Sequence, residues 1–449
     1  MTRSIRRSTV AVVLLVLLVL VLWRCTAGSD GDEEPALVSV FGPWLGEEAV
    51  AFAAVLDDFT DATGIEVAYV GSSDFDSDLR SRVTDGLGLP DLAIVPQPAL
   101  IAELVAMGVV EPLADETVDA LVQNFPFSRD ELVVFDGEAY LEPYRNNLKS
   151  LVWYRPEVFA ERGWEVPTTL DDLHALVEEI ATTDIAPWCF TMEAGSVTGW
   201  TATDWVEDLV LRRGGTAAYD EWLSGERPFD DELIREAYEE FEELVLAPGR
   251  VAGGIQRVVS TDVAEASGPL FTDPPGCAMY KQGSFAVNWF PDHTEVGSDG
   301  DVDAFVLPGV DADASPPLLV GGDGAVRFND RDEVAELMTF LATPEGTQAW
   351  VDRGGILSRR TTVDLDEYDE VDTRFATLLL DATDVRFDAS DTLVSSVREV
   401  LLTESARFVA EANYLDPTAG LDTLVAAVDR AREEVFGAGD GDSQTVEDG

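Results

Sequence analysis

The chain of 449 residues has few basic side chains for its size. It carries 29 lysines and arginines against 87 aspartates and glutamates, which gives a formal charge of −58. Only Lys149 and Lys281 are lysines. A surface of this kind repels nucleic-acid phosphates and anionic solutes. Because the acidic residues are spread along the chain, they are typical of a solvated coat suited to salty surroundings.

Histidine and the common catalytic motifs are also scarce. His174 and His293 are the only histidines, and the sequence has no Gly-x-Ser-x-Gly elbow, no His-Glu-x-x-His zinc motif and no phosphate-binding loop. We therefore expect no catalytic triad, no metal site and no cofactor.

The N-terminus has the layout of an export signal. Arginines at 3, 6 and 7 precede an apolar run over 10–23, about 14 residues, which is shorter than the roughly 20 that cross a bilayer. Residues 22–25 resemble a lipoprotein signal that ends in a lipid-modified cysteine, although that pattern has small residues where Trp23 and Arg24 stand. We expect a signal over 1–25 with lipidation at Cys25.

The chain has three cysteines, and the other two are Cys189 and Cys277. If Cys25 carries a lipid, an exported compartment is oxidising enough to join the remaining pair. We predict one disulfide, and two separate buried thiols are the alternative.

The pattern after an unfolded acidic tether at 26–35 alternates between strands and helices. Apolar runs at 37–41, 65–70 and 92–95 predict strands, and the segments between them have helical spacing. This order predicts a parallel sheet with helices on both faces, and the length favours two lobes. The C-terminal region has mostly helical spacing, and 437–449 reads as a disordered acidic tail.

Several runs carry a family resemblance through their order and spacing. They are residues 59–67, 89–97, 153–159, 187–189, 199–205, 273–277 and 321–323. Over about 37–436 the chain resembles family 1 of the extracellular solute-binding proteins, the maltose-binding-protein group, and within it the binding proteins of α-glucoside importers. That subgroup has similar runs around both Cys189 and Cys277.

The resemblance implies an α/β, two-lobe, periplasmic-binding-protein-like fold of type II, with discontinuous lobes joined by a three-segment hinge. The chain would cross between lobes near 145–150, 302–308 and 354–358. The N-lobe would then comprise 36–147 and 305–355. The C-lobe would comprise 148–304 and 356–436.

The resemblance also implies a carbohydrate site in the cleft, where flat aromatic rings cover sugar faces and polar groups bind hydroxyls. Trp200 and Phe285 are the candidates for stacking, and core packing is the alternative for any tryptophan here. The candidates for hydroxyl binding or close backbone approach are Glu47, Gln97, Asn146, Asn147, Glu193, Asp204, Gly322 and Asp323.

The implied partners are a neutral sugar, an α-glucoside or oligosaccharide, and the permease subunits of an ABC transporter. We expect no nucleic-acid partner, a monomer, and a lipid anchor on the extracellular face of the membrane or a periplasmic location. A secreted carbohydrate-active hydrolase is the alternative, because it too needs paired carboxylates and cleft aromatics.

Overall fold

The computed structural model describes residues 37–86, 88–124, 134–135, 137–358, 368–412 and 417–437. The chain divides into two units, Met1–Ala36 and Leu37–Gly449, and the fold described here belongs to the second. The predicted signal with Cys25, the tether at 26–35 and the tail after 437 lie outside the described residues. None of the described helices is long and apolar enough to cross a membrane.

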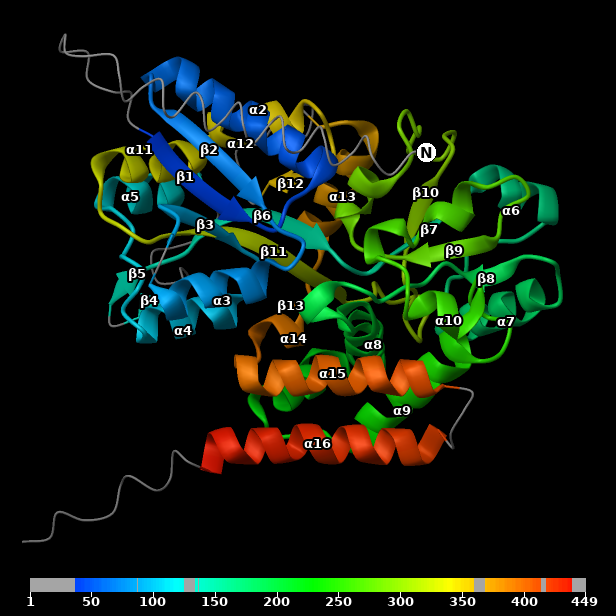
Figure 1. Cartoon of the computed structure of the whole chain (residues 1–449). Helices are drawn as coiled ribbons and strands as arrows, with labels where there is room; N and C mark the ends of the chain where they lie inside the picture. The colour runs from blue at the N-terminus through cyan, green and yellow to red at the C-terminus, as the bar shows by residue number, and fades with distance from the viewer. Residues whose placement is uncertain are drawn as a thin grey trace, which may run out of the picture. The chain divides into compact units, whose positions relative to one another are not determined.

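The larger sheet has seven strands among the described residues, in the order β12-β6-β11-β3-β1-β2 with β13 beside β11 (Figure 1). The strands are β1 (Leu37–Gly42), β2 (Glu66–Gly71), β3 (Leu92–Val95), β6 (Glu142–Leu148), β11 (Leu318–Arg327), β12 (Leu357–Ser358) and β13 (Val385–Phe387). β1 runs parallel to both β2 and β3, as predicted. β11 is antiparallel to β3 and β6, so the sheet is mixed.

Helices cover both faces of this sheet, with α2 and α12 on one side and α3 and α4 on the other (Figure 1). The helices of this part are α2 (Gly46–Thr63), α3 (Phe75–Asp85), α4 (Pro98–Ala106), α5 (Asp115–Asn124), α11 (Asp332–Leu341) and α12 (Glu345–Val351). Helix α2 buries Phe52, Val55 and Phe59 at helical spacing. It ends at Gly64, whose φ of 78° forms a left-handed cap.

The smaller sheet has four strands among the described residues, in the order β10-β7-β9-β8. They are β7 (Leu151–Tyr154), β8 (Ala186–Trp188), β9 (Cys277–Lys281) and β10 (Asp303–Val306). A short hairpin of β4 (Val134–Phe135) and β5 (Glu138–Ala139) lies apart from both sheets.

Helices pack around this second sheet. They are α6 (Pro156–Arg162), α7 (Leu170–Ala181), α8 (Trp200–Ser224), α9 (Glu232–Phe241), α10 (Gly254–Val258), α13 (Glu370–Asp381), α14 (Ala389–Thr392), α15 (Ser395–Glu411) and α16 (Pro417–Gly437). Short 3₁₀ helices are η2 (Gly195–Val197), η4 (Val263–Glu265), η5 (Gly268–Phe271) and η6 (Ser284–Trp289), and η3 (Glu242–Leu246) is a π-helix. Thr169 and Asp172 form a reciprocal capping box at the start of α7.

The chain passes between the two sheets more than once. Lys149 and Ser150 join β6 of the larger sheet to β7 of the smaller one, and the return lies between β10 and β11. After β12 the chain enters α13, where Phe375 packs edge-on against Trp153 of β7 with ring centroids 5.7 Å apart. The crossings that the resemblance implies near 145–150, 302–308 and 354–358, and the assignment of segments to moving lobes, stay predictions.

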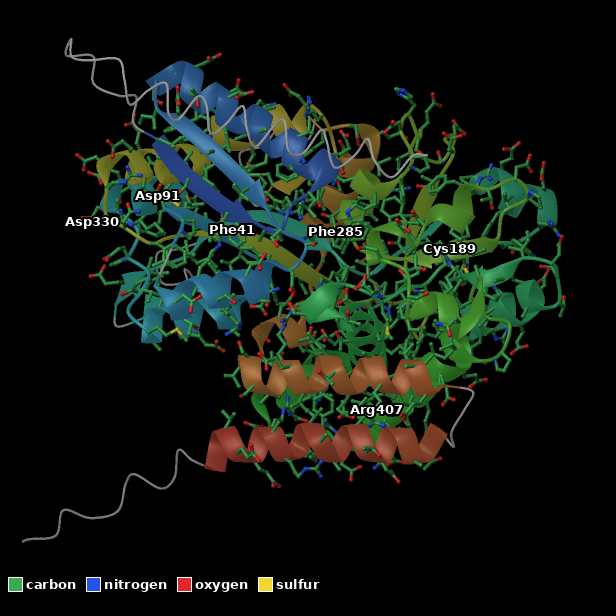
Figure 2. The ribbon with its side chains drawn as sticks, in the orientation of Figure 1. Phe41, Asp91, Cys189, Phe285, Asp330 and Arg407 are labelled. Atoms are coloured by element: carbon green, nitrogen blue, oxygen red, sulfur yellow. A yellow bond between two sulfur atoms is a disulfide. The ribbon has the colours of Figure 1, made fainter. Side chains whose placement is uncertain are left out.

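Cys189 and Cys277 form a disulfide, with Cα atoms 5.4 Å apart (Figure 2). Both residues are buried in the core of the second sheet, where Cys189 directly follows β8 and Cys277 begins β9. The bond therefore ties two neighbouring parallel strands together. The predicted disulfide is confirmed, and the alternative of two free thiols is wrong.

Candidate functional site

A cavity of about 230 Å³ lies at the carboxyl ends of β1, β2 and β3. It begins where these strands end, at Trp44, Ser72 and Gln97. β2 and β3 pair with opposite sides of β1, so the chain leaves β1 in different directions at this end of the sheet. Ligands of open α/β sheets bind at such points. The opposite wall comes from η2, α8, η6, α14 and α15, which belong to the second half of the fold.

Aromatic rings form part of the wall. Trp200, the first residue of α8, is half-buried, and its ring centroid lies 6.3 Å from that of Phe285. Gly199 precedes Trp200 with φ of 108°, and a Cβ there would lie 2.5 Å from the carbonyl oxygen of Leu402. Only glycine fits this close approach. The tight turn thus places Trp200 at the cavity, where an apolar ring face can stack.

An arginine with two carboxylates forms one side of the cavity floor. Arg145 donates from Nη1 to Glu48 Oε1 at 2.7 Å and from Nε to Asp323. Its guanidinium carbon also lies 5.0 Å from the ring centroid of Trp44. Burial raises the pKa of Glu48, and Arg145 opposes that shift. Gly322 lets β11 pass close to β6, because a Cβ there would lie 2.7 Å from the carbonyl oxygen of Arg145.

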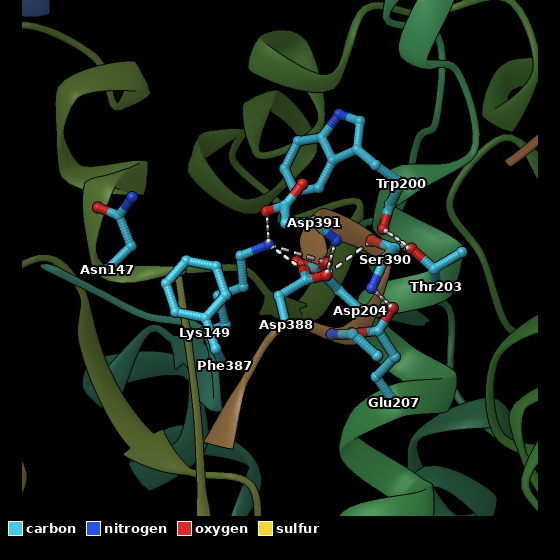
Figure 3. Close-up of polar contacts among 12 residues, drawn as sticks. Asn147, Lys149, Trp200, Thr203, Asp204, Glu207, Phe387, Asp388, Ser390 and Asp391 are labelled. Carbon is cyan, nitrogen blue, oxygen red and sulfur yellow. Dashed lines mark hydrogen bonds and ion pairs between the residues drawn. The ribbon is translucent and has the colours of Figure 1, made fainter. Parts of the chain in front are cut away.

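A lysine with three carboxylates forms the other side (Figure 3). Lys149 Nζ lies 3.1 Å from Asp204 Oδ1, 3.6 Å from Asp391 Oδ2, and in contact with Asp388. The ammonium also lies 5.6 Å from the ring centroid of Trp200. Lys149 is buried, so these carboxylates supply the charge compensation that water cannot.

The carboxylates around Lys149 differ in their affinity for protons. Burial and the charge of Asp388 raise the pKa of Asp391 to about 6, which Lys149 partly offsets. Burial opposes ionisation of Asp388, but Lys149 and its hydrogen bonds hold the pKa of Asp388 below its ordinary range. Burial raises the pKa of Asp204 well above its ordinary value in spite of Lys149.

The second lysine lies directly beneath the first. Lys281 Nζ pairs with Asp208 Oδ2 at 3.1 Å and donates to the carbonyl oxygens of Asp204 at 3.2 Å and Lys149 at 3.4 Å. Both lysines of the chain are therefore buried beside α8. Their ion pairs and hydrogen bonds connect β9 and the residues after β6 to α8 at the floor of the cavity.

The charges of the lining determine what the cavity accepts. Its described lining contains three cations, Arg145, Lys149 and Arg398, and each lies within ion-pair distance of at least two carboxylates. The acidic residues of the lining are Glu48, Asp74, Asp76, Asp323, Asp388 and Asp391. Carboxylates outnumber cations, so the site disfavours anions and offers acceptors for hydroxyl groups.

Three buried polar atoms at the wall have no hydrogen-bond partner among the described residues. They are the donors Trp44 Nε1 and Arg398 Nε and the acceptor Gln97 Oε1. A buried polar group without a partner costs free energy. All three atoms are covered by protein in this structure, so they indicate no particular ligand group.

The structure brings six of the predicted site residues together in the lining: Gln97, Asn147, Trp200, Phe285, Gly322 and Asp323. Four others lie outside it: Glu47, Asn146, Glu193 and Asp204.

The four outside positions have local explanations. Glu47 is on the exposed side of α2, while the next residue, Glu48, faces Arg145. Asn146 lies between two lining residues of β6, and alternate residues of a strand point to opposite faces. Glu193 accepts a hydrogen bond from the N–H of Gly195 within its own loop. Asp204 lies one helical turn after Trp200, beneath Lys149.

Sequence reasoning missed Trp44, Arg145, Lys149, Asp388 and Arg398 in the lining. The scarcity of lysine was a usable signal for Lys149, because a chain that favours arginine keeps lysine at only two positions. Asp388 and Arg398 carry no signal in the sequence, since the fold brings them to the cavity from far along the chain.

The fold has two α/β parts, and residues of both parts line the cavity, an arrangement typical of binding proteins. Comparison with known proteins gives its family. Residues 43–348 match the family described as bacterial extracellular solute-binding protein. The chain belongs to this family, which confirms the predicted resemblance and favours solute binding over the alternative of hydrolysis.

Two curated relatives match along most of their length. The chain is 36% identical over 386 residues to the osmoprotective compounds-binding protein GgtB of Synechocystis, covering 85% of this chain and 91% of that protein. It is 36% identical over 401 residues to the alpha-glucosides-binding periplasmic protein AglE of Rhizobium meliloti, covering 87% of each.

Solved structures show the same fold at lower identity. The bacterial solute receptor AcbH is 17% identical, with a TM-score of 0.76 over 90% of this chain and all of that chain. The solute-binding protein RafE in complex with raffinose is 18% identical, with a TM-score of 0.70 over 88% of this chain and all of that chain. These likenesses confirm the two-lobe α/β fold.

Proposed function

We propose that the protein is the carbohydrate-binding component of an ABC importer and that it captures a neutral α-glucoside or oligosaccharide of the maltose or trehalose type. The observation that carries this proposal is the cavity lining. It combines the rings of half-buried Trp200 and buried Phe285 with carboxylates and amides, while carboxylates neutralise every lining cation among the described residues. Few ligands other than sugars need apolar faces and a girdle of hydroxyl partners together.

The relatives support the same ligand class. AglE is named for alpha-glucosides, GgtB for osmoprotective compounds, and a further relative from Pyrococcus horikoshii is named an ABC transporter extracellular-binding protein. The cavity of about 230 Å³ is smaller than the ~300–1,000 Å³ of most drug-sized ligand pockets. Its size favours a compact glycoside of one or two rings.

The arrangement of the lining gives the mechanism of capture. Arg145 and Asp323 approach the ligand from the larger sheet, and Trp200 and Asp391 approach it from the other side. A ligand that contacts both sides at once favours their closure, because it shifts an equilibrium only through differential affinity. In our proposal the lobes at 36–147 with 305–355 and at 148–304 with 356–436 close around the sugar, and the permease recognises that form.

We further propose that the protein is exported and held at the extracellular face of the membrane by a lipid on Cys25, with monomeric binding domains. Membership of an extracellular solute-binding family supports export. Mass spectrometry of the mature N-terminus tests the anchor: a diacylglyceryl mass on Cys25 is expected, and an unmodified Cys25 would contradict it.

A thermal-shift panel tests the ligand class. Purified protein should melt at a higher temperature with neutral α-linked disaccharides, since a ligand present at 100 times its Kd stabilises the folded state by about 2.7 kcal/mol. Uronic acids, which carry a carboxylate, should give no shift. No shift with any neutral sugar would overturn the proposal, and release of monosaccharide during incubation would favour a hydrolase.

A further inference from the structure

A second hollow lies directly beyond the ligand cavity. Its volume is about 540 Å³, and its walls come from one face of α3 and one face of α15. Asp76, Ser196 and Arg398 line both this outer hollow and the inner cavity. These three residues therefore form the partition between the two spaces.

The side chain of Arg398 forms most of the partition, and its contacts with neighbouring carboxylates are long. Its Nη1 lies 3.4 Å from Asp76 Oδ2, and its Nη2 lies 3.5 Å from Asp391 Oδ1. Charge-assisted hydrogen bonds between these groups are normally about 2.7–2.9 Å long. Arg398 is buried, and its Nε has no hydrogen-bond partner among the described residues. The side chain thus closes the partition without a strong bond on either side.

The opposite side of the partition is fixed more firmly. Asp76 Oδ1 accepts from Arg80 Nε at 2.9 Å, and Arg80 Nη1 donates to Glu103 Oε2 at 2.8 Å. Ser196 donates its backbone N–H to Asp74 Oδ1 at 3.0 Å. Because Asp76 and Ser196 are each tied to neighbours, movement of the Arg398 side chain is the simplest way to join the two spaces.

The outer hollow has walls that suit a polyhydroxylated chain and not an anion. Ser77, Ser81, Thr84 and Thr403 contribute hydroxyl groups to it. Its arginines are Arg80 and Arg398, and both already pair with carboxylates. Hydroxyl groups can donate and accept, so they match sugar residues that continue outward from the inner cavity.

We propose that Arg398, closed against Asp76, determines the length of the ligand. With the partition closed, the inner cavity holds a glycoside of one or two rings, and displacement of Arg398 opens the outer hollow to further sugar residues. This inference rests on the proposed function and adds a specificity-determining residue to it.

Calorimetric titration with maltose, maltotriose and maltotetraose tests the inference on the purified full chain. The measured quantity is the ratio of the Kd for maltotetraose to the Kd for maltose. Arg398→Ala should lower this ratio at least about tenfold, because additional rings gain contacts in the opened hollow. Asp76→Ala removes the partition from its other side and should lower the ratio in the same direction.

Arg407→Ala is the matched control. Arg407 lies on the same helix and pairs with Glu404 and Glu411 (Figure 2), so its removal should leave the ratio unchanged. An unchanged ratio in folded Arg398→Ala or Asp76→Ala, or a wild-type protein that binds maltotetraose as well as maltose, would overturn the inference alone. A wild-type protein that binds no neutral sugar would overturn the proposed function and this inference with it.

Discussion

Replacement of Trp200 by alanine probes the sugar-stacking wall. Trp200 begins α8, is half-buried and faces the cavity beside Phe285. A tryptophan side chain buries roughly 150–250 Å² when it is fully covered. One ring face is about half of that, so a stacked sugar covers roughly 100 Å² of it. At about 25 cal/mol per Å² the lost contact costs about 2.5 kcal/mol, or roughly 70-fold in Kd.

Calorimetric titration with a neutral disaccharide measures this loss. Trp200→Phe is the matched variant, because it keeps an apolar face at the same position, and it should retain most of the affinity. The thermal midpoint without ligand shows whether each variant is folded. A folded Trp200→Ala protein whose Kd lies within threefold of the wild-type value would refute the stacking role.

Three further predictions concern stability, each measured by urea unfolding. Lys149→Met leaves buried carboxylates without their cation and should lower the free energy of unfolding by about 3–5 kcal/mol. Arg407→Ala removes a partly exposed ion pair and should lower it by under about 1 kcal/mol. Equal losses in the two variants would contradict the buried network. Burial raises the pKa of Asp372 to about 7, so the contribution of Asp372 to the free energy of unfolding should fall as pH rises from about 4 to about 7, because the folded state holds that proton more tightly. Asp372→Asn should remove this loss and be the more stable protein at pH 8 but not at pH 4; equal stability at pH 8 would contradict the shift. Reduction of Cys189–Cys277, which are separated by 88 residues, should cost up to about 4.5 kcal/mol, and no change would show that the bond does not constrain the unfolded chain.

Most of the fold was predictable from local patterns. Strand–helix alternation predicted β1, α2, β2 and β3, and Gly64 and the Thr169–Asp172 pair marked helix ends through backbone and capping chemistry. The antiparallel insertion of β11 between β3 and β6 was not predictable from pattern, because its partners are far away in the sequence.

The candidate site was predictable only in part, for physical reasons. Trp200 and Asp323 follow or adjoin glycines that allow close backbone approach, and the sequence shows those glycines. Whether Glu47 or Glu48 faces the cavity depends on the rotation of α2 about its axis, because adjacent residues of a helix point in different directions. Arg398 reaches the cavity only because α15 packs against the rest of the fold, so long-range packing determines its place.

Titration calorimetry with a neutral α-linked disaccharide and with its uronic-acid analogue distinguishes a binding site for neutral sugars from an anion site or a hydrolase. We expect one binding site for the neutral sugar and intact sugar recovered afterwards. We expect no measurable binding of the carboxylated analogue, because carboxylates outnumber cations in the lining. Tighter binding of the anionic analogue, or a cleaved disaccharide after the titration, would contradict it.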